Sequence, residues 1–402
     1  MKRVPDLSVE VIVGSQLPEM VSQPLTPYSS EAISFLGALS IRLFANPSIR
    51  LYPDVAAFAY WCRRSNLTRL SRSFDTQTRR IGRGLVLHIA PANVPVNFAF
   101  SLAFGILAGN ANIVRISESN HPQATIICGE ISDLFRDPKH TRIAAMTRVI
   151  KYPREHEITA ELSRLCHARV LWGGDVTINH LRSMITSPRC IDICFPDRYS
   201  LCILGAEAIN AADEQAIDNL VSGFYNDVFL LDQNACSSPH LVIWQGSRED
   251  VDNAMSRFWP AMEHLLSTKF VPPAIHAVDK YSHLCSVAIR LKGCTSISRQ
   301  QNYIYRVRLE SLPEKIENYR GQHGFFFEAI DNDLEGLKSI VDDRFQTVTC
   351  FGVSPQSIID SIIEAGVNGV DRVVPVGKAL DIGVIWDGYD IIGTLSRIIS
   401  EQ

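Results

Sequence analysis

From residue 84 onward, short apolar runs alternate with longer stretches in which apolar residues recur at helical spacing. This alternation predicts strands and helices in turn, because parallel strands need a crossover, which is usually a helix. The expected strands cover residues 84–90, 112–116, 147–151 and 168–172, and the expected helices cover 95–108, 121–135, 155–166 and 175–186. The pattern predicts an α/β fold with a doubly wound parallel sheet, which binds ligands beyond the carboxyl ends of its strands.

The regions before and after this alternating segment have different patterns of apolar and polar residues. The first eighty residues are expected to be mostly helical, with helices from Ser29 to about Phe44 and from Pro53 to Trp61, and a polar connection over 69–83. A second half begins near Leu201. Its expected elements are strands at 200–204 and 240–244, helices at 213–229, 248–266 and 272–289, mixed elements to about 374, and a tail that ends in a short helix.

Composition narrows the classes of function. Lys and Arg total 39 against 43 Asp and Glu, a formal charge of −4, so no overall basic field is available to bind nucleic acid. The ten cysteines form no CxxC pair and no cluster with zinc-finger spacing, so no metal site is predicted. Because the N-terminus also lacks the apolar core of a signal peptide, we expect reduced thiols in a cytoplasmic protein.

One stretch resembles a membrane span. Residues 85–109 (LVLHIAPANVPVNFAFSLAFGILAG) contain no charged residue. Two prolines, two asparagines and a histidine crowd its first half, and their polar groups and missing backbone hydrogen bonds would be costly in lipid. We therefore expect a buried strand, a turn and a buried helix, and no membrane span.

Cys236 is the candidate nucleophile. It lies in the loop Asp232-Gln233-Asn234-Ala235-Cys236-Ser237-Ser238-Pro239, between a predicted helix and a predicted strand and among small residues that leave it approachable. A thiolate in such a place attacks carbonyl carbons and is also a good leaving group. The alternative is a buried structural thiol, the ordinary role that we expect for the other nine cysteines.

Three further segments follow predicted strands. In Ala90-Pro91-Ala92-Asn93-Val94-Pro95, two prolines stiffen a turn in which Asn93 offers an amide N–H to an oxyanion, or else forms an Asx-turn or helix cap. In the second segment, Arg115 suits a phosphate and Glu118 a ribose, although charges at strand ends are usually only solvated. In the third, Gly173 and Gly174 permit close approach of a ligand at a helix start, yet no GxGxxG fingerprint is present.

In their order and spacing, the four segments resemble the aldehyde dehydrogenase superfamily. APANVP resembles its PWNFP turn, NIVRISES its strand ending in Lys-Pro-Ser-Glu, WGGD its Gly-Ser cofactor loop, and QNACSS its Gly-Gln-x-Cys-Ser nucleophile loop. More closely, residues 83–115, DQNACSSP and DRVVPVGKALDIGVIWDGYD are similar to the long-chain acyl-CoA reductases, including the LuxC-type subunit of bacterial fatty-acid reductase complexes. The likeness runs from about residue 80 to the C-terminus.

This resemblance implies an aldehyde-dehydrogenase-like fold with a Rossmann-type cofactor domain and an α/β catalytic domain. The implied domains are residues 1–200, a helical segment with the dinucleotide-binding domain, residues 201–375, the catalytic domain, and residues 376–402, a tail that packs back on the core. Cys236 would accept the acyl group, and Asn93 with the backbone N–H of Cys236 would hold the oxyanion. The implied cofactor-binding residues are Ala90, Pro91, Arg115, Ser117, Glu118, Gly173, Gly174 and Asp175.

Two departures from the superfamily bear on the reaction. Hydrolytic aldehyde dehydrogenases carry a Glu-Leu-Gly-Gly-Lys segment whose Glu activates water, whereas residues 190–198 (CIDICFPDR) contain no Glu and no Gly pair. An acyl-enzyme without that base is better suited to exchange with a thiol than to hydrolysis. The Glu-x-Phe-Gly-Pro segment also has no counterpart, and because residues 320–325 (RGQHGF) occupy that region the nicotinamide contacts stay unassigned.

The expected activity is therefore reduction of a long-chain acyl-CoA or acyl-protein thioester to the aldehyde. The resemblance implies NADPH, with NADH possible, since Glu118 would repel a 2′-phosphate that Arg115 would attract. Two alternatives stay open: a hydrolytic aldehyde dehydrogenase, and a non-catalytic acyl-binding scaffold subunit of a fatty-acid reductase complex. An acyl-protein synthetase is the partner that the resemblance suggests, and a homo-oligomer is expected.

Overall fold

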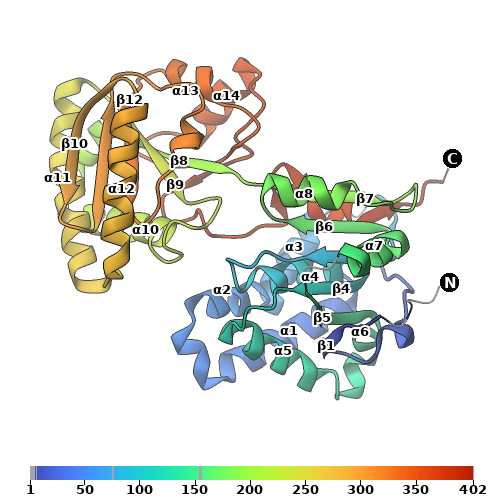
Figure 1. The fold of residues 1–402 in the computed structure, drawn as a ribbon. Coiled ribbons are helices and arrows are strands. Elements are labelled where there is room, and N and C mark those ends of the chain that lie inside the picture. Colours follow the sequence, from blue (N-terminus) through green and yellow to red (C-terminus); the bar gives the residue numbers. More distant parts are fainter. Residues whose placement is uncertain (1–4, 6, 75–76, 154–155, 402) are drawn as a thin grey trace. The chain divides into compact units, whose positions relative to one another are not determined.

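The computed structural model describes residue 5 and residues 7–74, 77–153 and 156–401. The chain forms two compact units (Figure 1). The first joins residues 1–196 to residues 384–402, and the second comprises residues 197–383. The domain boundaries expected near residues 200 and 375 differ from these unit boundaries, which follow residues 196 and 383. Residues 376–383 belong to the second unit, where the backbone N–H groups of Gly377 and Ala379 donate to the carboxylate of Asp227.

The first unit contains a six-stranded sheet in the order β1-β5-β4-β3-β6-β7. All neighbours are parallel except β1, which pairs antiparallel with β5. The strands of this sheet are β1 (Glu10–Val13), β3 (Leu85–Ile89), β4 (Ala111–Ile116), β5 (Thr147–Lys151), β6 (Ala168–Trp172) and β7 (Ile191–Phe195). Its helices are α1 (Ser30–Ala45), α2 (Pro53–Trp61), α3 (Arg64–Ser73), α4 (Asn97–Leu107), α5 (Pro122–Leu134), α6 (Thr141–Met146), α7 (His156–Leu165) and α8 (Asp175–Arg182).

This sheet has the predicted doubly wound order. The chain runs outward from β3 through β4 to β5, then returns to the other side of β3 with β6 and continues to β7. The direction therefore reverses between β3 and β6, and the carboxyl ends of these two strands border the crevice in which such sheets bind ligands. The alternation of strands and helices predicted for residues 84–182 is confirmed.

The uncharged stretch over 85–109 folds into β3, a turn and α4. All eleven residues of α4 are buried, which explains why its sequence is apolar on every side. None of the helices in the described part of the chain is long and apolar enough to cross a membrane.

The second unit contains a seven-stranded sheet in the order β10-β11-β12-β9-β8-β13-β14, parallel except between β10 and β11. Its strands are β8 (Tyr199–Gly205), β9 (Pro239–Gln245), β10 (Cys294–Gln300), β11 (Ile304–Leu309), β12 (Phe325–Ile330), β13 (Phe345–Phe351) and β14 (Arg372–Pro375). Its helices are α9 (Ala206–Ala211), α10 (Glu214–Val228), α11 (Arg248–Lys269), α12 (Ala274–Arg290), α13 (Glu335–Ile340) and α14 (Pro355–Ala365).

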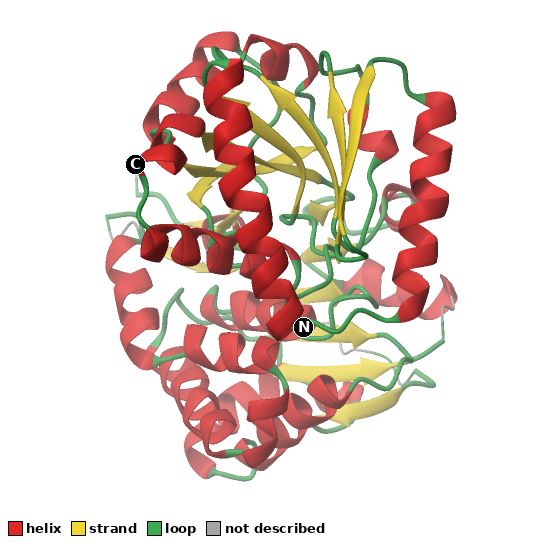
Figure 2. Cartoon of the chain, turned by 90° about the vertical axis from the view of Figure 1, so that its left-hand side faces the viewer, coloured by secondary structure: helices red, strands yellow, loops and turns green. Residues whose placement is uncertain are grey.

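Both faces of this sheet are buried. Leu201 and Ile203 of β8 share one core with residues of α12, α13 and α14, whereas Cys202 and Leu204 share another with residues of α9, α10 and α11. Successive side chains of a strand point to opposite faces, so a strand between two layers of helices is apolar throughout. Figure 2 shows helices on either side of these strands.

The structure corrects several expected elements. The polar stretch expected as a connection over 69–83 begins with the end of α3, because Leu67 and Leu70 bury one side of an otherwise polar helix, and it ends with β2 (Arg80–Gly82). Residues 75 and 76 lie outside the described residues. The edge strands β1 and β7 were not expected, and α8 ends at Arg182 rather than near residue 186.

The tail does not end in a helix. After β15 (Ile385–Trp386), β16 (Tyr389–Asp390) and the short α15 (Ile391–Thr394), it ends in β17 (Ser396–Ile398), which pairs antiparallel with β2. The side chains of Arg83 and Asn110 donate to the backbone carbonyls of Thr394 (2.6 Å) and Leu395 (2.9 Å). These bonds attach the tail to the first unit.

Candidate functional site

The predicted cofactor segments leave the first sheet from three adjacent strands. Ile89, the last residue of β3, is paired with Arg115 of β4 on one side and with Leu171 of β6 on the other. The backbone N–H of Ala90 continues the ladder by donating to the carbonyl of Arg115 (3.1 Å). The loops that begin at Ala90, Ser117 and Gly173 therefore lie together at the carboxyl edge of the sheet, which is the side where its parallel strands end. They flank the point where the strand order reverses.

A buried polar network lies beneath this edge. His88 of β3 contacts Ser101 of α4 (2.8 Å) and Asn112 of β4 (3.1 Å), and the indole N–H of Trp172 donates to the same serine hydroxyl (3.1 Å). Burial lowers the pKa of His88 to about 4, so its imidazole is neutral at pH 7. The network joins β3, β4, β6 and α4 and holds the three loops in register.

The individual cofactor candidates differ in their surroundings. Gly173 and Gly174 have open space where a Cβ would lie, with only Thr177 near Gly173, so their backbone is accessible to a ligand. Asp175 begins α8, and Glu118 is exposed in the loop after β4. The side chain of Arg115 donates to the carbonyl of Tyr152 (3.3 Å), and its guanidinium lies 5.5 Å from the centre of the Tyr152 ring.

Asn93 is exposed in the turn between β3 and α4. It does not cap the helix, because α4 begins after Val96 and has no side-chain cap. The neighbouring carbonyl of Ala92 contacts the His121 ring at 3.1 Å. The helix-cap alternative for Asn93 is therefore wrong, and its side chain is exposed in this turn.

The loop that carries Cys236 has an unusual backbone. Asp232 and Gln233, two consecutive residues after α10, both have positive φ angles, 50° and 61°. The buried amide of Gln233 holds this shape: its nitrogen donates to the carbonyls of Pro239 (2.9 Å) and Phe325 (3.1 Å), and its oxygen accepts from the N–H groups of Gly324 (2.9 Å) and Phe325 (3.3 Å). One side chain thus fixes the loop to the beginnings of β9 and β12.

Cys236 is half-buried and lies at the amino ends of the strands of the second sheet. The amide of Gln346, the second residue of β13, donates to its sulfur (3.3 Å). Its backbone carbonyl accepts from the hydroxyl of Ser200, the second residue of β8 (2.7 Å). That hydroxyl also accepts from the N–H of Thr347 (3.1 Å). The candidate nucleophile is therefore held against β8 and β13, at the amino ends of the strands of its sheet. The candidate residues of the first unit lie instead at the carboxyl ends of the strands of their own sheet.

A positive charge also acts on this sulfur. Arg372, in β14, interacts electrostatically with Asp381, Asp227 and Cys236, and it donates to the carbonyls of Lys378, Ala379 and Asp381. Asp227, almost fully buried, accepts from the N–H groups of Gly377 (2.6 Å) and Ala379 (2.8 Å). Burial raises the pKa of Asp227 to about 7, although both hydrogen bonds oppose that shift.

The other cysteines occupy varied places. Five are buried (Cys62, Cys128, Cys166, Cys202 and Cys350), three are half-buried (Cys190, Cys194 and Cys294), and Cys285 is exposed on α12. Burial raises the pKa of the Cys128 thiol to about 12, and it also raises the pKa values of Cys62 and Cys202. The expectation that all nine are buried is therefore wrong for the three half-buried cysteines and for Cys285, which provides an accessible thiol for comparison with Cys236.

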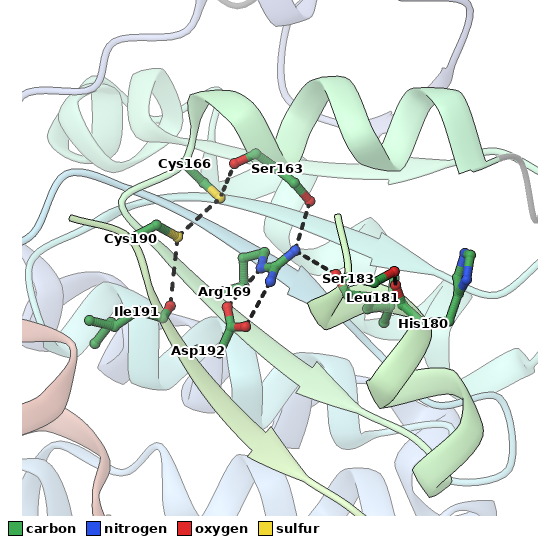
Figure 3. Close-up of polar contacts among 9 residues, drawn as sticks. All are labelled: Ser163, Cys166, Arg169, His180, Leu181, Ser183, Cys190, Ile191 and Asp192. Atoms are coloured by element: carbon green, nitrogen blue, oxygen red, sulfur yellow. Dashed lines mark hydrogen bonds and ion pairs between the residues drawn. The ribbon is translucent and has the colours of Figure 1, made fainter. Parts of the chain in front are cut away.

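Residues 190–198, the stretch compared with the water-activating segment, include the edge strand β7. The carboxylate of Asp192 accepts two hydrogen bonds from the buried guanidinium of Arg169, both at 2.7 Å (Figure 3). Arg169 also donates to the carbonyl of Leu181 (2.8 Å), and the sulfurs of Cys166 and Cys190 are 3.9 Å apart beside it. The acidic side chain of this strand is thus committed to a structural ion pair.

A cavity of about 270 Å³ lies in the second unit between α11 and strands β10 to β12. It is lined by residues that include Trp259, Arg306 and Glu328, and none of the predicted site residues lines it. Glu328 is fully engaged there, accepting from the indoles of Trp244 and Trp259 and from Arg306. The cavity is therefore separate from the loop that carries Cys236.

Nine of the ten predicted site residues thus belong to one edge of the first unit, and Cys236 belongs to the second unit. Gln346, Arg372, Ser200 and Gln233 were not predicted as site residues. For Gln346 and Ser200 the sequence offers no signal, because strand order alone brings them to Cys236, whereas Arg372 lies in the quoted segment DRVVPVGKALDIGVIWDGYD. Gln233 lies inside the quoted QNACSS motif, and a polar side chain within an otherwise small-residue loop was the available signal.

Comparisons with known proteins agree with this arrangement. The family model "Acyl-CoA reductase (LuxC)" matches residues 61–398. A long-chain acyl-protein thioester reductase of Vibrio harveyi is 30% identical over 181 residues (43% of this chain, 35% of that protein). One of Aliivibrio fischeri is 28% identical over 316 residues (74% and 62%). The chain spans 34% to 66% of the length of the four curated relatives that it matches.

Solved structures establish the fold. The NADP-dependent glyceraldehyde-3-phosphate dehydrogenase of Bacillus halodurans, solved with NADP, superposes with a TM-score of 0.62 at 13% identity and covers 93% of this chain and 86% of its own. The predicted aldehyde-dehydrogenase-like fold is thereby confirmed. With a family model that matches most of its length, the chain belongs to the acyl-CoA reductase (LuxC) family.

Proposed function

We propose that this protein reduces a long-chain acyl thioester to the aldehyde through a thioester on Cys236. The observation that carries the proposal is the Cys236 loop: a half-buried thiol with a hydrogen-bond donor on its sulfur and a guanidinium acting on it. A nucleophilic sulfur that is approachable and held in place by such contacts suits acyl transfer. Family membership supports the same chemistry, because the curated relatives are named long-chain acyl-protein thioester reductases.

In the first stage the Cys236 thiolate attacks the carbonyl carbon of the acyl thioester. A tetrahedral oxyanion forms, and Asn93 and the backbone N–H of Cys236 are the proposed donors to it. The bond to the carrier sulfur then breaks, the carrier leaves as a thiol after taking up a proton, and the acyl group remains on Cys236. This stage consumes no reductant.

A nicotinamide cofactor, when bound, supplies the hydride for the second stage. We propose that it binds at the carboxyl edge of the first sheet, along Ala90, Pro91, Arg115, Ser117, Glu118, Gly173, Gly174 and Asp175. Three features support this location. The strand order reverses between β3 and β6, Gly173 and Gly174 have open space where a Cβ would lie, and α8 begins at the same edge. Asn93 and the backbone N–H of Cys236, the proposed oxyanion donors, also hold the thiohemiacetal anion on Cys236. This anion collapses to release the aldehyde and restore the thiolate.

The proposal extends to specificity and setting. We propose NADPH as the preferred reductant, a cytoplasmic location in which the thiol stays reduced, and a homo-oligomer that receives acyl groups from an acyl-protein synthetase. Light scattering after size exclusion, with and without such a synthetase, measures both assemblies. Hydrolytic oxidation of aldehydes is disfavoured by the ion pair of Asp192, and release of free acid from an aldehyde with oxidised cofactor would support it instead.

Intact-protein mass spectrometry after incubation with a series of acyl-CoAs, without cofactor, tests the central step. We expect one added acyl group on the wild type and on the Cys285→Ser variant, which removes an exposed thiol on α12. The Cys236→Ser variant should stay unlabelled. Labelling that persists in Cys236→Ser, or disappears in Cys285→Ser, would show that another nucleophile takes the acyl group. A scaffold without turnover would bind acyl-CoA but gain no covalent mass.

A further inference from the structure

Three side chains that the proposed reaction does not use converge in the second unit. Asp232 comes from the Cys236 loop, His276 from the first turn of α12, and His323 from the loop before β12. One ligand atom from each lies within 4.8 Å of the other two. The shared carboxylate oxygen, Oδ2 of Asp232, is 2.6 Å from Nδ1 of His323 and 3.5 Å from Nδ1 of His276.

The protein alone leaves part of this cluster unsatisfied. Oδ1 of Asp232 and Nδ1 of His276 are buried and have no hydrogen-bond partner among the described residues. The two imidazole rings stack nearly in parallel with their centres 3.7 Å apart, and both have Nδ1 near the carboxylate of Asp232. Because buried polar atoms without a partner cost free energy, a ligand that bonds to these atoms would stabilise the cluster.

We propose that Asp232, His276 and His323 bind a divalent transition metal ion, with Zn²⁺ as the ion that fits them best. Two imidazoles and one carboxylate form a donor set that Zn²⁺ uses when a fourth position is left to water or substrate. An ion between them would give Oδ1 of Asp232 or Nδ1 of His276 a partner. The three ligands lie far apart in the sequence, which is why no metal-binding spacing appears there.

The location gives the ion a structural role. Asp232 lies four residues before Cys236 and has a positive φ angle, and the ion would tie it to α12 and to the segment that precedes β12. One positive group opposes binding: the nearly buried Lys280 interacts with the charge of Asp232, and its ammonium donates to the carbonyl of His323 (2.7 Å). The bond positions His323, and the charge weakens cation binding without removing any ligand.

Metal binding is measured on the full chain with neither acyl donor nor cofactor, so its outcome is independent of the proposed function. After treatment with a chelator, the protein is titrated calorimetrically with ZnCl₂. We expect one Zn²⁺ per chain at this site. Loss of groups that merely orient metal ligands typically costs 10- to 100-fold in affinity, so His276→Ala and His323→Ala should each weaken binding at least about 100-fold.

Two controls separate this site from the cysteines and from surface histidines. His264→Ala, on the exposed side of α11, and Cys236→Ala should bind Zn²⁺ as the wild type does. Co²⁺ as a spectroscopic probe should show ligand-field bands without a sulfur-to-cobalt charge-transfer band. Zn²⁺ should raise the Tm of the wild type and of His264→Ala but not that of His276→Ala, whose circular dichroism verifies folding. Unchanged affinity in both histidine variants, a sulfur-ligated Co²⁺ spectrum, or no binding to the wild type would overturn the proposal.

Discussion

The side-chain amide of Gln346 donates a hydrogen bond to the sulfur of Cys236, across 110 residues of sequence. A hydrogen bond to a charged group is worth about 1.5 to 3 kcal/mol, so Gln346→Ala should slow acylation of Cys236 by about 10- to 100-fold. Gln346→Glu should slow it further, because a carboxylate repels the thiolate. Rapid-quench mass spectrometry measures the acylation rate. Rates equal to that of the wild type in both variants would contradict this role of Gln346.

Asn93 should matter at the oxyanion. Removing one donor of an oxyanion hole costs about 3 to 4 kcal/mol, so Asn93→Ala should reduce the acylation rate by roughly 100- to 1,000-fold while leaving the Tm unchanged. Single-turnover kinetics with acyl-CoA provides the measurement. Asn253→Ala, on the exposed side of α11, is the matched control and should react normally. A normal rate for Asn93→Ala would remove this residue from the mechanism.

Glu118 should select the cofactor. It is exposed at the carboxyl end of β4, where a carboxylate repels a 2′-phosphate. Removing one such surface charge is worth up to about 1 kcal/mol, so Glu118→Gln should raise kcat/KM for NADPH by about fivefold and change that for NADH less. Glu157→Gln on α7 is the control. Equal changes with both cofactors would place Glu118 away from the ribose.

Asp227 should make stability depend on pH. Burial raises its pKa to about 7 in the folded chain, against an ordinary value of 3.8. Between these values the folded state holds a proton that the unfolded state has released, so this group lowers the free energy of unfolding as pH rises from about 4 to 7. The stability of Asp227→Asn relative to the wild type should therefore increase between pH 4.5 and pH 6.5. Urea denaturation at both values measures it, and a pH-independent difference would contradict the shift.

The ion pair of Arg169 and Asp192 should be important for stability. Arg169 is 2% exposed, and removing its partner leaves a buried charge uncompensated, so Asp192→Asn should lower the free energy of unfolding by about 3 kcal/mol. The half-exposed pair of Arg164 and Glu161 on α7 is a matched control, and Glu161→Gln should cost less than about 1 kcal/mol. Similar losses in the two variants would contradict the prediction that Asp192→Asn leaves an uncompensated buried charge.

The sequence predicted what local patterns determine. Strands 147–151 and 168–172 were placed to the residue, because each has a short apolar centre (Val149-Ile150 and Val170-Leu171-Trp172) and lies between stretches of helical spacing. The edge strands β1, β7 and β17 were missed, because each has at least two side chains that are not buried and so lacks that signature. The pairing of β17 with β2 joins segments more than 300 residues apart, which local patterns cannot reveal.

The candidate site divides along the same line. Cys236 and the loops at Ala90, Ser117 and Gly173 were predictable, because each lies in a short motif of its own. Gln346 and Ser200 were not, because they reach Cys236 only through the order of β8, β9 and β13 in the sheet. The ligands of the proposed metal site were missed for the same reason: three separate elements supply one side chain each.

The amide of Gln233 has a consequence for chemical ageing. All four of its hydrogen-bonding positions are used, two as donor and two as acceptor. Deamidation would turn the donating nitrogen into a second oxygen facing two carbonyls, so the segment would repel the very groups that shape it. Its burial shields the amide from hydrolysis in the folded protein. In old or partly unfolded preparations, the reactivity of Cys236 should therefore fall even though no cysteine has been chemically modified.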